Sequence, residues 1–389
     1  MRINPISAQN FNCNSRLAGV KANTIQQKTN STNPQSVYYV DLVNFTSGAD
    51  TRTVPDIEYF DYMRMSDIQK RFFRKRCEQF NENMNMAELD NGKKNYLPLL
   101  DDKVMKDFLK VCDVYRNLKD EPILCLGRSP KWFLNTALWM KDGIEDYNFV
   151  AFSGYWYARY QHPGTDWFDY EPLNSVKPTA EEKKKYKKYL KSVKADPKSI
   201  VKIAEKTGKK VVITDYINSG KGAMSFLDVM SEFAEEDGIL DEFANSIRFV
   251  GIGCMEYQKK FVRGADDYGV PTPSVPLPPR LEKYYRVIPQ EFHDMPLKVF
   301  EEMLINENTN ECRSTYFPHG SWTLYNPKNF RTGKMSSQKL IELRKKHPRG
   351  YATFNPTMKD YRNLLNFRIL DYLAQHDMLR ENMNSKMWS

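Results

Sequence analysis

The chain of 389 residues carries a net charge of +9, and 41% of its residues are hydrophobic. This composition excludes a chain that is disordered throughout, and because no run of 18 apolar residues occurs we expect no membrane-spanning helix. The positive charge favours polyanionic partners, either nucleic acid or small phosphorylated molecules. Residues 1–11 lack the apolar core of a signal peptide, and the six scattered cysteines form no Cys-x-x-Cys pair, so we expect a cytoplasmic protein in a reducing compartment.

The first 119 residues divide into two parts. Residues 1–36 are rich in Asn, Gln, Ser and Thr and show no apolar period, which predicts a disordered leader. Residues 37–119 predict a helical lead-in that opens with a short apolar strand at 37–43. Between 62 and 116 apolar residues recur at helical spacing, so we expect this part to pack on the sheet of the core as helices.

Residues 120–269 predict the core of the protein. Four short apolar runs predict strands buried on both faces, at 122–127, 148–153, 211–213 and 247–254. Helical patterns separate these runs, at 131–140, 183–194, 199–207 and 223–236. Ser129 before Pro130 predicts the N-cap of the first of these helices. Strands that alternate with helices indicate an α/β fold with a parallel sheet and right-handed crossovers.

The remaining segments differ in character from this core. Residues 155–170 form an aromatic insertion after the second strand, which we expect to pack against the sheet, with stacking on a ligand as the alternative. Residues 270–279 hold five prolines and predict an extended linker. Residues 280–389 predict a mostly helical region, either a second domain or a cap over the sheet. Within it, the polar and aromatic cluster at 313–322 has no role that the sequence assigns.

Residues 211–223 combine four features that suit an anion. The apolar run at 211–213 predicts a strand, and Asp215 stands where that strand would end. The small residues at 218–222 allow a tight turn, and a helix pattern begins at Ala223. A helix N-terminus presents unpaired N–H groups to a phosphate, and a carboxylate accepts hydrogen bonds from sugar hydroxyls. We therefore predict a cradle for a phosphorylated sugar.

This segment resembles the phosphoribosyl-pyrophosphate loop of the type I phosphoribosyltransferases, whose pattern is an apolar strand, two acids, two apolar residues and a short turn that opens a helix. The turn here consists of Ser219, Gly220, Lys221 and Gly222. Two departures are Thr214 in place of the first acid and Asn218 where some members carry a catalytic acid. An ordinary turn between strand and helix in a doubly wound domain is the alternative interpretation.

The resemblance implies roles for two loops. Asp215 would hold ribose hydroxyls and a Mg²⁺ ion that arrives with the pyrophosphate, while Thr214, Asn218 and the turn at 219–222 would contact the substrate. After the first strand, Arg128 is suited to a bidentate hold on the departing pyrophosphate, and Ser129 can donate to it as well. The simpler interpretation of this second loop is a helix start with a surface arginine.

The function implied by the resemblance is that of a phosphoribosyltransferase-like enzyme, a glycosyltransferase that binds phosphoribosyl pyrophosphate or a ribose 5-phosphate nucleotide and transfers or releases the phosphoribosyl group. The alternative is a non-catalytic regulator or RNA-binding protein on the same fold, because Thr214 replaces an acid and residues 183–194 hold seven lysines. A solvated face of an amphipathic helix also explains these lysines. The sequence names no acceptor, and it leaves the oligomeric state open, a homo-oligomer included.

Overall fold

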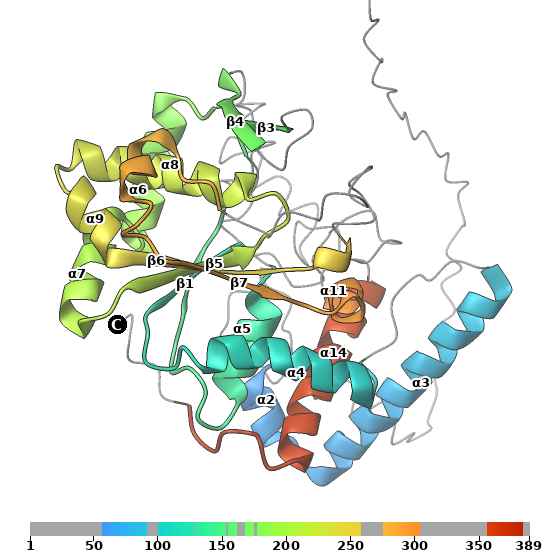
Figure 1. Cartoon of the computed structure of the whole chain (residues 1–389). Helices are drawn as coiled ribbons and strands as arrows, with labels where there is room; N and C mark the ends of the chain where they lie inside the picture. The colour runs from blue at the N-terminus through green and yellow to red at the C-terminus, as the bar shows by residue number, and fades with distance from the viewer. Residues whose placement is uncertain are drawn as a thin grey trace, which may run out of the picture. The chain divides into compact units, whose positions relative to one another are not determined.

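The computed structural model describes the following parts of the chain (Figure 1): 57–91, 100–127, 129–152, 155–161, 168–174, 177–257, 275–303 and 356–383. All of them lie in one unit that covers residues 48–389. The expected leader at 1–36, the expected strand at 37–43, Arg128 and the cluster at 313–322 lie outside the described residues, as does the first half of the expected linker at 270–279.

A five-stranded parallel sheet forms the centre of the described structure. Its order is β2-β1-β5-β6-β7, and every pair of neighbours is parallel. The strands are β1 (Ile123–Leu126), β2 (Asn148–Val150), β5 (Val211–Tyr216), β6 (Ile247–Gly253) and β7 (Gln290–Asp294). The first four coincide with the four predicted apolar runs, so the α/β fold with a parallel sheet is confirmed.

The fifth strand corrects the prediction for residues 280–389, which we expected to be mostly helical. β7 lies at the edge of the sheet, and its residues are only partly buried or exposed. Such a strand needs no continuous apolar run, because only its inner edge and part of one face meet the core. The sequence therefore carries no strand signal at this point.

Helices cover both faces of the sheet, as expected of a doubly wound fold. One face carries α4 (Asp102–Arg116), α5 (Lys131–Trp139) and α11 (Leu297–Met303), which bury their apolar residues with Val212 and Val250. The other face packs against Val211, Ile213 and Phe249. Its elements are α6 (Ala180–Ser192), α7 (Pro197–Thr207), α8 (Lys221–Glu236), α9 (Leu240–Ser246) and the 3-10 helix η2 (Pro279–Tyr284).

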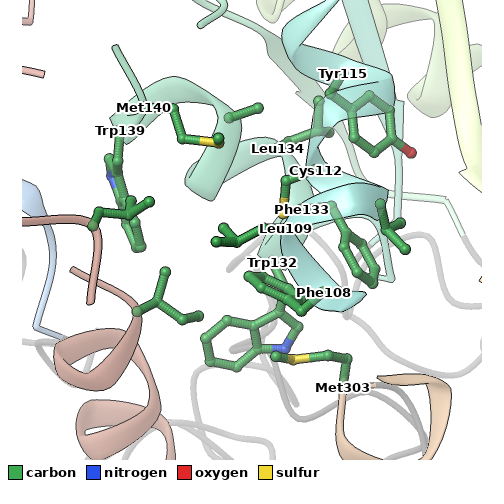
Figure 2. Close-up of a cluster of buried hydrophobic side chains, with 14 of the residues drawn as sticks. Phe108, Leu109, Cys112, Tyr115, Trp132, Phe133, Leu134, Trp139, Met140 and Met303 are labelled. Atoms are coloured by element: carbon green, nitrogen blue, oxygen red, sulfur yellow. The ribbon is translucent and has the colours of Figure 1, made fainter. Parts of the chain in front are cut away.

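Large side chains fill the core on the α4 and α5 side (Figure 2). Phe108 and Phe133 are fully buried, and their ring centroids lie 5.3 Å apart. Trp132, on the same helix as Phe133, is 1% exposed. Because such rings each remove a large apolar area from water, this packing fixes α4 and α5 against each other and against the sheet.

The lead-in and the C-terminal helix share this core. α14 (Pro356–Gln375) contacts α2 (Tyr59–Arg64), α3 (Asp67–Asn91) and α5. The buried carboxylate of Asp371 accepts two hydrogen bonds of 2.7 Å from Arg74 and one of 3.0 Å from Tyr62. Residues 280–389 were expected to form either a second domain or a cap over the sheet. The described helix α14 packs with the lead-in and does not form a core of its own.

The aromatic insertion contains an antiparallel hairpin that the sequence analysis did not anticipate. Its strands are β3 (Tyr157–Gln161) and β4 (Phe168–Pro172), which pair only with each other. The strand β3 contacts α8. Trp156, which precedes β3, is 3% exposed and belongs to the buried cluster that contains the apolar residues of α8. The insertion was expected to pack against the sheet, and at this point it packs against a helix that covers the sheet.

Candidate functional site

The order of the sheet reverses between β1 and β5. In chain order these are the first and third strands of the sheet, and the second strand, β2, lies on the far side of β1. Cys125 pairs with Thr214, so the two strands end at the same edge. Ligands of open α/β sheets bind outside the carboxyl ends of the strands at such a reversal. Both predicted loops therefore start at the place that the fold favours for a ligand.

The loop after β5 leads directly into α8. Gly220 is the N-cap of this helix with φ +72°, and no side chain caps the helix. The sequence analysis placed the start of the helix at Ala223, and the structure begins it two residues earlier, at Lys221. Asn218 is exposed, whereas Ser219 and Gly222 are half-buried. The first N–H groups of α8 and its dipole thus lie directly after the turn, where they favour an anion.

Asp215 lies near the end of β5 and is half-buried. One carboxyl oxygen accepts the backbone N–H of Tyr216 at 2.7 Å. Burial raises the pKa of Asp215 to about 8, against the opposing effect of that hydrogen bond. The carboxyl group is therefore mostly neutral at pH 7, and a cation or a sugar hydroxyl beside it would favour the charged form.

The residue of the neighbouring strand β6 that pairs with Asp215 is Gly251. The ring of Phe292, on β7, occupies the space that a side chain at 251 would need. A Cβ atom at Gly251 would come within 2.8 Å of this ring and 2.9 Å of Ile217. The glycine is therefore required by close packing.

Thr214 occupies a different environment from Asp215. It is fully buried, and its hydroxyl shares a hydrogen bond of 2.8 Å with the hydroxyl of Tyr115 on α4. Because its hydroxyl is committed to Tyr115, Thr214 supports the strand in this arrangement and does not reach toward the loop. A charged acid in its place would be buried against an aromatic ring, which would be costly.

The loop after β1 differs in one respect from the prediction. Pro130, and not Ser129, is the N-cap of α5, and no side chain caps the helix. The carbonyl of Pro130 already accepts the N–H groups of Phe133 and Leu134, so the first turn starts there. Gly127 has φ +66° and donates its N–H to the carbonyl of Val150 at 2.9 Å. Ser129 is half-buried at the start of α5.

Each of the two helices at the reversal begins with a lysine. Lys131 Nζ lies 4.5 Å from the ring centroid of Phe149, and Lys221 Nζ lies 3.9 Å from that of Tyr155. Lys131 was missed by the sequence analysis, although its place directly after the loop was a usable signal. Two cations at the starts of α5 and α8 give this edge of the sheet a positive character.

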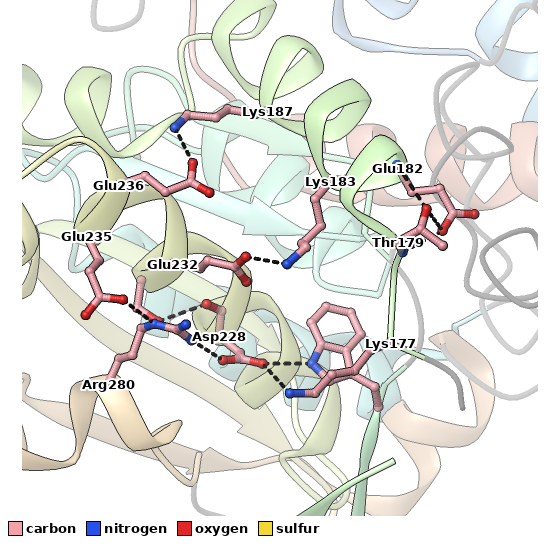
Figure 3. Close-up of polar contacts among 12 residues, drawn as sticks. Lys177, Thr179, Glu182, Lys183, Lys187, Asp228, Glu232, Glu235, Glu236 and Arg280 are labelled. Atoms are coloured by element: carbon pink, nitrogen blue, oxygen red, sulfur yellow. Dashed lines mark hydrogen bonds and ion pairs between the residues drawn. The ribbon is translucent and has the colours of Figure 1, made fainter. Parts of the chain in front are cut away.

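The hairpin is fastened to the first turns of α8. The N–H of Trp156 donates to Ser225 Oγ at 3.0 Å, and its indole N–H donates to Asp228 at 2.9 Å. Asp228 also pairs with Arg280 and Lys177 (Figure 3). Both Ser225 and Asp228 are buried, so these bonds satisfy polar groups that would otherwise be costly. Sequence alone could not identify these two residues, because their partners lie about 70 positions away.

The β4 strand also reaches the loop after β5. Tyr170, which is half-buried, donates its hydroxyl to the carbonyl of Ser219 at 3.4 Å. Tyr155 is 41% exposed and covers the ammonium of Lys221. The hairpin therefore borders the loop at 218–222 and presents an aromatic ring beside its cation.

The described residues hold no group of three or more His, Cys, Asp and Glu side chains arranged for a metal ion. Among the described residues of the two loops, the carboxylate side chain is that of Asp215. Mg²⁺ is commonly bound by one or two carboxylates together with phosphate oxygens of a substrate. The donor set therefore fits an ion that is shared with a phosphorylated ligand.

Comparison of the chain with protein-family models, with curated proteins and with solved structures finds no match. Within the described part of the chain, no helix combines the length and apolar character that a membrane span requires.

We predict that Tyr115→Phe lowers the free energy of unfolding by about 1–3 kcal/mol, because it leaves the Thr214 hydroxyl buried without its partner. Adding Thr214→Val should restore much of this loss, since both partners are then apolar. Urea unfolding of the wild type, both single variants and the double variant measures the coupling. Strictly additive losses would show that the two hydroxyls do not depend on each other.

We also predict a pH-dependent contribution of Asp215 to stability. Its pKa is about 8 in the folded protein and about 3.9 in an unfolded chain. The folded state binds the extra proton between these values, so the stabilisation is complete below about pH 4 and is lost as the pH rises through 8. The variant Asp215→Asn has no carboxyl group at this position and does not lose this stability. The difference in melting temperature, variant minus wild type, should therefore increase between pH 5 and pH 8.5. Parallel curves for the two proteins would contradict the raised pKa.

Proposed function

We propose that the crevice at the carboxyl ends of β1 and β5 binds a phosphorylated ribose, as a phosphoribosyltransferase-like enzyme does. The observation that carries this proposal is the position of the two loops at the reversal of strand order. Each loop leads into a helix with no side-chain cap and a lysine at its first position. Two such helix starts on adjacent strands suit a ligand with two separate anionic groups.

Each part of the ligand contacts a different set of residues. The backbone of the turn at 219–222 and the ammonium of Lys221 bind the 5′-phosphate, with Asn218 exposed beside them. Asp215 accepts hydrogen bonds from the ribose hydroxyls. On the β1 side, Ser129, Lys131 and the adjacent Arg128 attract the pyrophosphate. The protein acts mainly by positioning the sugar and by neutralising charge where the leaving group departs.

A Mg²⁺ ion bound with the substrate would offset part of the charge of the pyrophosphate. Asp215 is the side chain that would share it, and its carboxyl group must lose a proton to do so. Because the pKa of this group is about 8 in the free protein, binding of the Mg²⁺ complex releases a proton at neutral pH. Affinity for the complex therefore rises with pH up to about 8. The acceptor of the phosphoribosyl group is left open.

We predict that isothermal titration detects binding of phosphoribosyl pyrophosphate with Mg²⁺ to the wild type and a clear loss of affinity in Asp215→Asn. The heat should also change with the ionisation enthalpy of the buffer in the wild type, because a proton leaves Asp215, and not in the variant. If neither protein gives heat at millimolar ligand, or if the two behave alike, the proposed site is wrong.

Two glycines of α8 provide a matched test of the loop. Gly220 and Gly238 lie at opposite ends of this helix with φ +72° and +69°, so alanine at either position costs about 1–2 kcal/mol of backbone strain. Gly238 is exposed and a Cβ there meets no atom within 4 Å, whereas Gly220 is buried. We therefore predict that Gly220→Ala loses at least as much stability in thermal unfolding as Gly238→Ala, and that only Gly220→Ala weakens binding of ribose 5-phosphate at a temperature where both variants are folded. Equal binding by both variants would remove the loop from the site.

A further inference from the structure

The lysines of α6 fall into two sets, one of which is bound to α8. Lys183 forms an ion pair with Glu232, and Lys187 pairs with Glu236 at 2.9 Å and with Asp237 at 3.1 Å (Figure 3). Lys183 and Lys187 are half-buried and one helical turn apart. Their charges are therefore matched by carboxylates within the protein.

The second set faces outward. Lys184, Lys188 and Lys191 are exposed, and among the described residues none of them has a carboxylate within ion-pair distance. They are spaced at i, i+4 and i+7, which places them on one face of the helix over a length of about 10 Å. We call these three residues the outer lysine stripe.

Most of the net positive charge of the chain lies in the segment that contains this stripe. Residues 181–210 hold twelve lysines and four acidic residues, a net charge of +8, whereas the complete chain carries +9. The rest of the protein is therefore close to neutral as a whole. A concentration of like charge on one segment is unfavourable for folding, so it requires either solvent screening or an external partner of opposite charge.

We propose that the outer lysine stripe binds the phosphate backbone of a nucleic acid. An anionic membrane surface would share the charge but also take up apolar side chains. The apolar residues Tyr186 and Leu190 of α6 are buried, and the exposed large hydrophobic side chains of the described residues lie outside α6 and α7. With phosphate contacts alone, binding is independent of base sequence and depends strongly on salt. None of these three lysines belongs to the proposed ribose site.

The test measures the salt dependence of binding to a fluorescent 20-nucleotide oligouridine. We predict that the triple variant Lys184→Gln/Lys188→Gln/Lys191→Gln lowers the slope of log affinity against log salt by about 2, because each phosphate contact of a single strand contributes about 0.7. Between 50 and 200 mM salt the wild type should then lose roughly 16-fold more affinity than the variant. The single variant Lys188→Gln should lower the slope by about 0.7.

The matched control is Lys103→Gln/Lys106→Gln/Lys119→Gln, which removes the same charge from exposed lysines in and just after α4. Its slope should equal that of the wild type. Equal effects of the two triple variants would overturn the proposal, since net charge would then explain the binding. The proposal would also be overturned if the wild type did not bind the oligonucleotide at 50 mM salt. It would be overturned as well if the wild type instead bound vesicles with one-third anionic lipid through the outer lysine stripe. Circular dichroism melting verifies that each variant is folded.

Discussion

The parallel pairing of β1 with β5 determines where everything else in the described structure lies. Val212 and Ile213 of β5 are 0% and 1% exposed and belong to opposite faces of the sheet, so this strand needs a neighbour on each edge and helices above and below. β1 and β6 are those neighbours. The same pairing places the carboxyl ends of β1 and β5 side by side. Thr214 of β5 also shares a hydrogen bond with Tyr115 of α4, so the lead-in is tied to the strand that carries Asp215.

The sequence predicted those parts of the fold in which each strand meets apolar neighbours on both faces. The runs at 122–127, 211–213 and 247–254 are of this kind. The run at 148–153 also predicted its strand, although β2 is a partly buried edge strand. β7 was missed because Gln290–Asp294 contains no apolar run, which a half-solvated edge strand does not need. The β3–β4 hairpin was missed because its aromatic residues suit several conformations equally well. The tight turn after β5 was predicted from its small residues. The hydrogen-bond partners of Asp228 and Thr214 could not be predicted from the sequence, because these bonds join residues far apart in the chain.

Helix α8 connects the three polar features of the molecule. Its first residues form the loop end of the proposed site, and its second turn holds the hairpin through Ser225 and Asp228. Its last turn receives Lys187 from α6. Buried polar contacts of this kind fix one arrangement of packed elements, since a shift of either partner leaves a donor or acceptor unsatisfied. The position of the hairpin beside the loop is therefore coupled to the packing of a single helix.

The central claim is that a phosphorylated ribose contacts both loops at the reversal of strand order. Selective ¹⁵N-glycine labelling tests it directly, because Gly127 lies on the β1 loop and Gly220 and Gly222 on the β5 loop, while Gly208 and Gly238 lie at other helix ends. On titration with ribose 5-phosphate, we predict that the amide signals of Gly220 and Gly222 shift and those of Gly208 and Gly238 stay in place. Addition of pyrophosphate should then shift Gly127. Unchanged loop signals, or shifts confined to Gly208 and Gly238, would contradict the account.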